Sequence, residues 1–436
     1  MKKRVLIFPC GSEIGLEVYR ALKYNKDFTL IGGSSVNDHG KYVFGNYIEN
    51  IPSVDDKNFI DEINRIINEN KIDLLYPAHD SVVLKFSENA KKLNAVVVTS
   101  EFFTCDICRS KGKTYEYFKN IILTPKLYKK SSITQKDFPI FLKPDVGQGS
   151  KGTKMLNNED DLNYYYKDSS QLLLEYLPYD EYTIDCFTDF NGNLKLCSGR
   201  KRARISNGIS VNTEYIYNPN FEKIANLINS NLKFNGAWFF QLKENSNHEL
   251  SLLEIAPRIA GTMEYQRCFG INLPLLNLYN SCGINVDIIK NSYSGSMDRA
   301  LESKFKLDIN YNYIYIDLDD VIIQNKKVNY EVIAFLYKSK NENKKIYLLT
   351  RHFQKPELTL EKYQIYNLFD KIIHINDTTP KSKFITHNDS IFIDDSFKER
   401  KDVFENSNIP VFDVNMIDIL LCQNFSGVST KINKIK

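Results

Sequence analysis

FLKPDVGQGSKG, residues 141–152, is the stretch that decides how the centre of this chain folds. It begins with a short apolar strand that ends in Lys143. Four small residues follow the lysine: Gly147, Gly149, Ser150 and Gly152. Glycines let backbone N–H groups approach phosphate oxygens, and a lysine adds positive charge. The stretch therefore predicts a phosphate-binding loop, although a run rich in Gly and Ser is also typical of a plain hairpin turn.

Oxygen-bearing side chains follow this loop at intervals on predicted strands. Glu175 ends an apolar strand, and Glu181 comes just before the next one. Gln241 and Glu254 lie on two later strands. Oxygen ligands on adjacent strands can hold Mg²⁺ against the oxygens of a triphosphate. The pattern indicates an α+β domain with strands at 172–176, 182–189, 194–198, 237–243 and 250–255.

Strands and helices alternate at the amino-terminal end. The strands are predicted at 4–8, 29–32, 73–76 and 95–99, with helices at 13–23 and 58–70. This alternation predicts a doubly wound parallel sheet. The first turn carries only Gly11 and Gly15 and lacks the GxGxxG spacing. We interpret it as a tight strand-to-helix turn that lines a cleft rather than as a dinucleotide-binding loop.

A third alternating block begins near residue 311. Asp317 and Asp319 follow an apolar strand, Thr350 ends a second strand, and Asp394 with Asp395 ends a third. Carboxylates crowded at strand ends would repel one another without a cation. The set therefore predicts a magnesium site, whereas aspartates that merely form turns would explain each motif singly but not the group.

Residues 1–305 resemble the ATP-grasp superfamily, in its carbamoyl-phosphate-synthase-like and amino-acid-ligase-like branch. The resemblance rests on the amino-terminal strand–turn–helix, on Tyr76–Asp80, on the loop at 141–152 and on Glu254–Arg258. It implies that Lys111 and Lys143 contact the phosphates of ATP, beneath a flap formed by the loop. It assigns the other nucleotide contacts to backbone groups of Glu175 and Leu177, and to the carboxylate of Glu181 on the ribose.

The same resemblance implies a metal and substrate site. Gln241 and Glu254 would bind magnesium, and Arg258 would steady the transferred phosphate or the acyl phosphate. The family motif usually reads Glu-x-Asn-Pro-Arg, whereas Ala256 stands at the Asn position here, and the first metal position is Gln241 rather than Glu. Whether these changes abolish or only weaken ligase activity stays open. A substrate carboxylate is expected near one of three arginines, Arg200, Arg202 or Arg204; the alternative is that these arginines only form a solvated basic strand.

Residues 311–422 resemble the haloacid-dehalogenase (HAD) superfamily of phosphatases. The resemblance implies that Asp317 is the nucleophile, Asp319 the general acid and then base, and Thr350 the phosphate-holding residue. Lys381 would balance charge, with Lys383 as the alternative. The implied magnesium residues are Asp317, Asp319, Asp394 and Asp395. The short stretches between these motifs leave no room for a cap domain, so an open site is expected.

Composition excludes several classes of protein. The 57 Lys and Arg nearly balance the 54 Asp and Glu, and this gives no reason to expect a nucleic acid or an acidic membrane as partner. No apolar run approaches the roughly 20 residues of a membrane span, and the one at Val5–Phe8 is too short for a signal peptide. The eight cysteines are scattered, as expected for a reduced cytoplasmic protein. We attribute the CxxC at Cys105–Cys108 to chance spacing in a turn.

These inferences combine into a multidomain α/β and α+β architecture. We expect a Rossmann-like pre-ATP-grasp domain at 1–108, a two-lobed ATP-grasp domain at 109–308, a capless Rossmann-like HAD domain at 309–425, and a tail at 426–436.

The expected function is that of a bifunctional enzyme that uses ATP and Mg²⁺. Its front part would join a small-molecule carboxylate to an amine through an acyl phosphate, and its rear part would hydrolyse a phosphate monoester. One substrate would then carry the phosphate that the rear part removes. The alternative is a HAD phosphatase whose ATP-grasp region only binds nucleotide or substrate. The sequence leaves a homodimer open.

Overall fold

The computed structural model describes residues 2–147, 149, 151–206, 209–293, 295–305 and 307–421. The chain forms two compact units, one that ends at Leu301 and one that begins at Glu302. The further division of the first unit at residue 108, and a boundary at 309, stay predictions. Ser150 and the predicted tail lie outside the described residues.

A five-stranded parallel sheet opens the first unit, in the order β3-β2-β1-β4-β5. Its strands and main helices alternate along the chain, as predicted. They are β1 (Lys3–Phe8), α1 (Glu13–Leu22), β2 (Phe28–Gly33), β3 (Tyr47–Ile48), α3 (Phe59–Asn70), β4 (Leu74–Pro77), α4 (Asp80–Glu88) and β5 (Val96–Val97).

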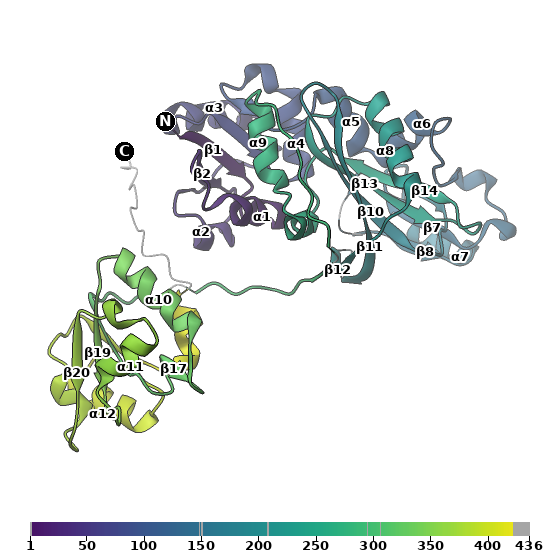
Figure 1. Cartoon of the computed structure of the whole chain (residues 1–436). Coiled ribbons are helices and arrows are strands. Elements are labelled where there is room, and N and C mark those ends of the chain that lie inside the picture. The colour runs from purple at the N-terminus through teal and green to yellow at the C-terminus, as the bar shows by residue number, and fades with distance from the viewer. Residues whose placement is uncertain are drawn as a thin grey trace. The chain divides into compact units, whose positions relative to one another are not determined.

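Alternate residues of β1 enter two separate cores, because successive side chains of a strand point to opposite faces. Val5 and Ile7 pack with α1 and with α9 (Leu273–Ser281), a helix that lies beside α1 although it comes much later in the chain (Figure 1). Leu6 and Phe8 pack with α3 and α4 on the other face. Helices therefore cover both faces of the sheet, and the carboxyl ends of its strands stay available for a cleft.

A six-stranded antiparallel sheet, in the order β14-β13-β10-β11-β12-β15, forms the larger part of the middle of the chain. One face packs against α8 (Pro219–Asn231) through Trp238 and Phe240 (Figure 1). The other face joins the core of the parallel sheet through Phe187 and Phe239. Its strands are β10 (Glu181–Thr188), β11 (Leu194–Ser206), β12 (Ile209–Tyr215), β13 (Gly236–Glu244), β14 (Leu250–Ala256) and β15 (Ser296–Asp298).

A smaller antiparallel sheet has the order β6-β9-β7-β8 and its own core around Ile140, Leu142 and Leu173. The predicted phosphate-binding loop joins β7 to β8. The strands are β6 (Leu127–Tyr128), β7 (Ile140–Pro144), β8 (Lys154–Leu156) and β9 (Gln171–Glu175).

The second unit is built on a parallel sheet in the order β20-β19-β16-β21-β22. Ile314 and Ile316 of the central strand pack against α10 and α13, whereas Tyr315 packs against α12. The elements are β16 (Tyr313–Ile316), a hairpin of β17 (Ile323–Gln324) and β18 (Lys327–Val328), α10 (Tyr330–Asn341), β19 (Lys345–Thr350), α11 (Pro356–Lys362), β20 (Lys371–His374), β21 (Ser390–Ile393), α12 (Phe397–Ser407), β22 (Val411–Phe412) and α13 (Ile417–Leu421).

Two local predictions were wrong. The strand predicted at 194–198 continues to Ser206, because cross-strand partners accommodate its basic residues. The CxxC segment is not a turn but part of helix α5 (Phe102–Arg109), where the spacing of three residues places Cys105 and Cys108 on one buried face. Within the described residues, no helix is long and apolar enough to cross a membrane.

Candidate functional site

One pocket in the first unit gathers most of the predicted nucleotide residues. The predicted residues that line it are Lys111, Lys143, Gly147, Gly149, Glu175, Leu177, Glu181, Gln241 and Glu254. They come from both antiparallel sheets, from the loops after β7 and β9, and from the start of α6 (Lys111–Phe118). Gly152 is not among the lining residues, Arg258 lines an adjoining pocket, and Ser150 lies outside the described residues.

Two lysines supply positive charge at the loop end of this pocket. Lys111 begins α6 (Lys111–Phe118), and its Nζ donates to the carbonyl oxygen of Gly147 at 3.2 Å. Burial lowers the pKa of Lys143, and the charge of Lys111 lowers it further, although Glu254 opposes the shift. A polyanion placed here would relieve the repulsion between the two ammonium groups, so the loop end suits a chain of phosphates.

The pocket also has apolar lining residues that suit a flat ring. Phe141, Leu174, Tyr176 and Leu253 line it. The backbone N–H of Leu177 donates to no protein group in the described part of the chain. A free N–H beside an apolar slot can recognise a ring nitrogen, in line with the role that the resemblance implies.

Glu175 is more engaged within the protein than the sequence suggested. Its N–H donates to the carbonyl oxygen of Lys126 at 2.9 Å, and its carboxylate accepts from the N–H of Lys126 at 3.1 Å. These two hydrogen bonds tie the end of β9 to the start of β6. The N–H of Glu175 is therefore not available to a nucleotide.

Glu181 forms ion pairs with two cationic side chains that were not predicted as its partners. Arg202 Nη1 lies 3.1 Å from Glu181 Oε1, and Lys243 Nζ lies 3.7 Å from Oε2. All three residues line the pocket. An ionised carboxylate offers about four acceptor positions, so hydroxyl donors of a sugar still fit beside these cations. Strand register was the missing information, because Glu181 pairs with Lys243 across β10 and β13.

Gln241 and Glu254 stand opposite each other on β13 and β14. Their side chains line the same pocket and offer one amide oxygen and one carboxylate. Ala256 adds no ligand atom. This donor set fits a single Mg²⁺ that takes its other ligands from phosphate oxygens and water.

The adjoining pocket has one wall at the carboxyl ends of β1 and β4. Ser12, His79 and Asp80 line that wall. The turn around Gly11 is closed by a side chain, since a Cβ on Gly11 would lie 2.1 Å from Asp38 Cγ. This leaves no space for a pyrophosphate against Gly11 and agrees with a turn that lines a cleft. Both pockets share Lys111 and Glu254, so a molecule here would lie next to the nucleotide phosphates.

Arg258 is held by Asp80 in this second pocket. Arg258 Nε lies 2.5 Å from Asp80 Oδ1, and Nη2 lies 2.6 Å from Oδ2. Burial alone would raise the pKa of Asp80, but Arg258 overrides this effect and lowers it. The segment 76–80 is part of the predicted resemblance, but no role was predicted for Asp80 itself.

The three arginines of β11 have different surroundings. Arg200 is fully buried and makes a two-pronged ion pair with Asp185, at 2.8 and 3.0 Å. Arg204 is exposed and pairs with Asp298. Arg202, the partner of Glu181, lines both pockets.

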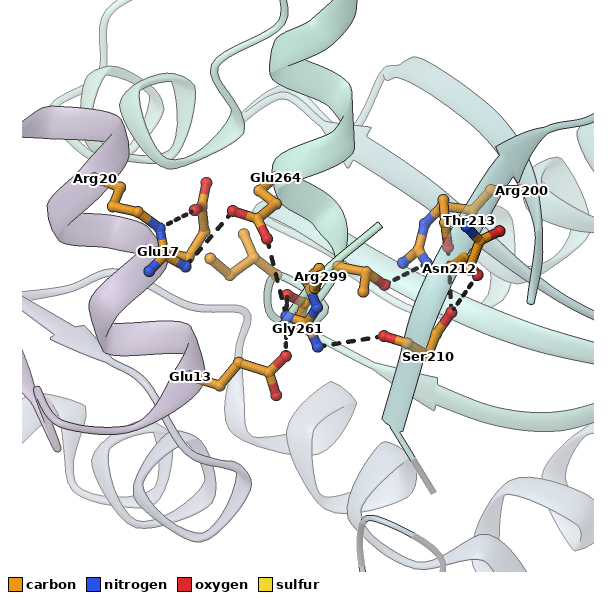
Figure 2. Close-up of polar contacts among 12 residues, drawn as sticks. Glu13, Glu17, Arg20, Arg200, Ser210, Asn212, Thr213, Gly261, Glu264 and Arg299 are labelled. Atoms are coloured by element: carbon orange, nitrogen blue, oxygen red, sulfur yellow. Dashed lines mark hydrogen bonds and ion pairs between the residues drawn. The ribbon is translucent and has the colours of Figure 1, made fainter. Parts of the chain in front are cut away.

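Another arginine, Arg299, neutralises the acidic residue at the start of α1 (Figure 2). It forms an ion pair with Glu13 and donates to the carbonyl oxygens of Gly261, at 2.8 Å, and Ser210, at 3.3 Å. Glu13, Gly261 and Ser210 all line the second pocket. Glu13 is therefore already paired with an arginine that does not line this pocket.

Three predicted carboxylates meet in the second unit. Oxygens of Asp317, Asp394 and Asp395 all lie within 4.8 Å of one another. Asp317 directly follows β16 and Asp394 directly follows β21, which is the neighbouring strand. Burial raises the pKa of Asp317 to about 6, although Lys381 opposes the shift. Such crowding fits a divalent cation.

Lys381 and Thr350 lie against this cluster, as the resemblance implied. Lys381 Nζ lies 2.6 Å from Asp394 Oδ2 and 3.2 Å from Asp317 Oδ1. The Thr350 hydroxyl acts on Asp317 as a hydrogen-bond donor and lowers its pKa somewhat. One lysine offsets one of the three carboxylate charges, so the cluster keeps a negative charge for a metal.

Asp319 has a different partner. Both of its carboxylate oxygens lie 2.9 Å from Nδ1 of His352, and Nε2 of His352 lies 2.8 Å from the Thr359 hydroxyl. The side chain of Asp319 is not among those gathered in the carboxylate cluster. His352 was not predicted as a site residue, although its position two residues after Thr350 placed it at the same edge of the sheet.

Comparisons with known proteins bear on the first unit. Residues 167–298 match a family model described as ATP-grasp in the biosynthetic pathway with Ter operon. The comparison with curated proteins found no match for this chain.

Solved structures with a similar fold include N5-carboxyaminoimidazole synthetase from Staphylococcus aureus in complex with ADP. It is 17% identical, covers 69% of this chain and 83% of its own, and has a TM-score of 0.58. The biotin carboxylase domain of 2-oxoglutarate carboxylase from Hydrogenobacter thermophilus, with MgADP, ADP and bicarbonate, is 14% identical, covers 66% and 72%, and has a TM-score of 0.56. These shares of the chain are close to that of the first unit. The first unit therefore has the ATP-grasp fold.

Proposed function

We propose that the first unit is an ATP-dependent carboxylate–amine ligase that acts through an acyl phosphate. The observation that carries this proposal is the convergence of Lys111, Lys143, Glu181, Gln241 and Glu254 on one pocket that adjoins a second one. The similar structures from S. aureus and H. thermophilus contain ADP, which supports a nucleotide in this pocket.

The chain's own groups supply most of the proposed chemistry. A carboxylate is a poor electrophile, because displacement would have to expel oxide, whereas an acyl phosphate has a good leaving group. Lys111 and Lys143 would hold the phosphates and stabilise the charge of the transferring phosphoryl group. Glu254 and Gln241 would hold magnesium, which supplies further positive charge when bound. The loop after β7 would exclude water that otherwise hydrolyses the acyl phosphate.

The substrates would be small molecules, a carboxylate and an amine, that meet in the second pocket. Arg258 would steady the acyl phosphate from there, because its guanidinium lines that pocket while Asp80 fixes its position. The bound amine would then attack the acyl carbon, and an amide would form with release of phosphate.

The test is ADP release in the presence of Mg²⁺ and a panel of carboxylates and amines. We expect Lys143→Ala to lower the rate at least about 100-fold. Lys154→Ala serves as the matched control, because Lys154 is exposed on β8 outside the pocket. If the wild-type chain releases no ADP with any pair, the unit only binds nucleotide or substrate, the alternative that Gln241 and Ala256 favour.

We propose that the second unit is a magnesium-dependent phosphomonoesterase of the HAD type. Its support is the carboxylate cluster of Asp317, Asp394 and Asp395 beside Lys381. Asp317 would attack phosphorus and form an aspartyl phosphate, and water activated by Asp319 would then hydrolyse it. Magnesium would be held by Asp317, Asp394 and Asp395, without the predicted fourth ligand Asp319, whose carboxylate contacts His352 instead.

Hydrolysis of p-nitrophenyl phosphate with added Mg²⁺ tests this second activity. Asp317→Asn should abolish it, because an amide cannot serve as the nucleophile. Asp418→Asn, an exposed aspartate of the same unit, should leave it unchanged. Equal activity in the Asp317→Asn variant would show that this residue is not the nucleophile.

A further inference from the structure

The second pocket of the first unit contains one arginine that forms no ion pair with the described residues. Three of its arginines are neutralised: Arg200 by Asp185, Arg202 by Glu181 and Arg258 by Asp80. Arg109 lines the same pocket, yet it makes no ion pair with any of the described residues.

Arg109 is held in place by a neutral group. It ends helix α5, and its Nη2 donates to the Ser81 hydroxyl of α4 at 3.2 Å. Both oxygens of the nearby Asp80 accept from Arg258. Asp80 is therefore the one carboxylate beside two guanidinium groups, those of Arg258 and Arg109. This part of the pocket keeps an excess positive charge.

The neighbouring groups respond to this excess of charge. Burial lowers the pKa of His79, and the charges of Arg258 and Arg109 lower it further. His79 Nδ1 accepts a hydrogen bond from the N–H of Ser81, which fixes the neutral ring with its proton on Nε2. His79 is therefore neutral, and the charged groups beside it are Arg109 and the ion pair of Arg258 with Asp80.

We propose that Arg109 binds a second anionic group of a substrate, a carboxylate or a phosphate that is not the one activated by ATP. The activated carboxylate has to lie beside Lys111 and Glu254, which both pockets share. Arg109 lines only the second pocket, so its anion lies apart from the reacting atoms. This inference rests on the proposed ligase function, and it makes Arg109 a specificity residue that selects substrates with a remote negative charge.

The direct test is isothermal titration calorimetry on the full chain. The nucleotide pocket is first filled with Mg²⁺ and a non-hydrolysable ATP analogue, so that an added anion cannot occupy the phosphate positions. Succinate and inorganic phosphate are then titrated separately, which distinguishes a carboxylate site from a phosphate site. Arg109→Gln should weaken the binding of the preferred anion about 10- to 100-fold, whereas Arg109→Lys should keep most of it.

Two outcomes overturn the proposal: neither anion binds the wild-type chain at about 10 mM, or Arg109→Gln binds as the wild type does. Arg65→Gln is the control, because Arg65 is exposed and pairs with Glu62 and Glu69 on α3. ADP release is measured in parallel. Binding that depends on Arg109 without any ADP release would refute the ligase and keep the anion site. With a substrate pair that carries a second anionic group, ADP release that Arg109→Gln leaves unchanged would refute the anion site and keep the ligase.

Discussion

His352 holds Asp319, the predicted general acid of the second unit, in place. The hydrogen bonds of its ring go to Asp319 and Thr359 and not to the carboxylate cluster. Its ring lies between the Asp319 carboxylate and the Thr359 hydroxyl. In the proposed reaction, loss of this support would leave the nucleophile Asp317 intact but would let Asp319 turn away from the leaving group. We expect His352→Ala to lower kcat for p-nitrophenyl phosphate about tenfold with little change in KM. His352→Gln, which can donate to the same carboxylate, should recover part of the rate, and an unchanged kcat in both variants would contradict the role.

The pKa of Asp317 predicts how stability depends on pH when no metal is added. Because burial raises this pKa to about 6 from 3.8, the folded state favours the protonated acid. The protonated Asp317 carboxyl therefore contributes about 2 to 3 kcal/mol to the free energy of unfolding. This contribution is complete below pH about 4 and is lost as the pH rises through 6.

Thermal unfolding in EDTA between pH 4.5 and 7.5 measures this effect. The difference in Tm between wild type and Asp317→Asn should change in favour of the variant as the pH rises. Added Mg²⁺ should restore the wild type at pH 7.5, since it favours the ionised carboxylates. A difference in Tm that is constant across this range would contradict the raised pKa.

Strand β11 carries a matched pair of ion pairs, one buried and one exposed. Arg200 and Asp185 are both fully buried, and Thr262 and Gln266 complete their hydrogen bonds. Removal of one partner leaves an uncompensated buried charge. Arg200→Ala should therefore lower the free energy of unfolding by about 3 to 5 kcal/mol, as urea unfolding would measure. The control on the same strand is Arg204→Ala, which should cost less than about 1 kcal/mol because its pair with Asp298 is exposed. Equal effects of the two substitutions would show that burial does not decide the strength of these pairs.

Local patterns predicted most of these elements, and partners distant in sequence explain the exceptions. The apolar run of β1 and the helical spacing of α3 are visible within a few residues, so both elements lie where they were expected. The length of β11 depends instead on neighbouring strands: β12 pairs with it up to Ser206, and Asp185 of β10 holds Arg200. No local rule favours a strand with arginines at alternate positions, because the stabilisation of this strand comes from partners on neighbouring strands.

The same distinction holds for the sites of the whole molecule. Residue types and spacing predicted which lysines and carboxylates line one pocket or lie in one cluster, because each motif is local. Ion pairs between distant segments could not be predicted in this way: Asp80 and Arg258 are 178 positions apart. Arg109 was not predicted as a site residue for the same reason. It stands out only because the nearby carboxylates form ion pairs with other arginines.

The two units have separate cores and separate sites. We therefore expect the proposed ligase activity not to need the rear part of the chain. All residues of the two pockets precede Leu301, as does Arg299, which holds Glu13 in the second pocket. We therefore expect a chain that ends at Leu301 to release ADP at the rate of the full chain, measured with the substrate pair that the panel identifies.

The products should nevertheless differ if the two activities act in sequence on one molecule. The shortened chain and full-length Asp317→Asn should both yield an amide that is heavier by one phosphate group than the product of the wild type, as mass spectrometry would detect. Asp418→Asn should yield the wild-type product, because it leaves the carboxylate cluster intact. Identical products from all four proteins would mean that the second unit acts on a different phosphate ester, and the proposed coupling would then be wrong even with both activities present.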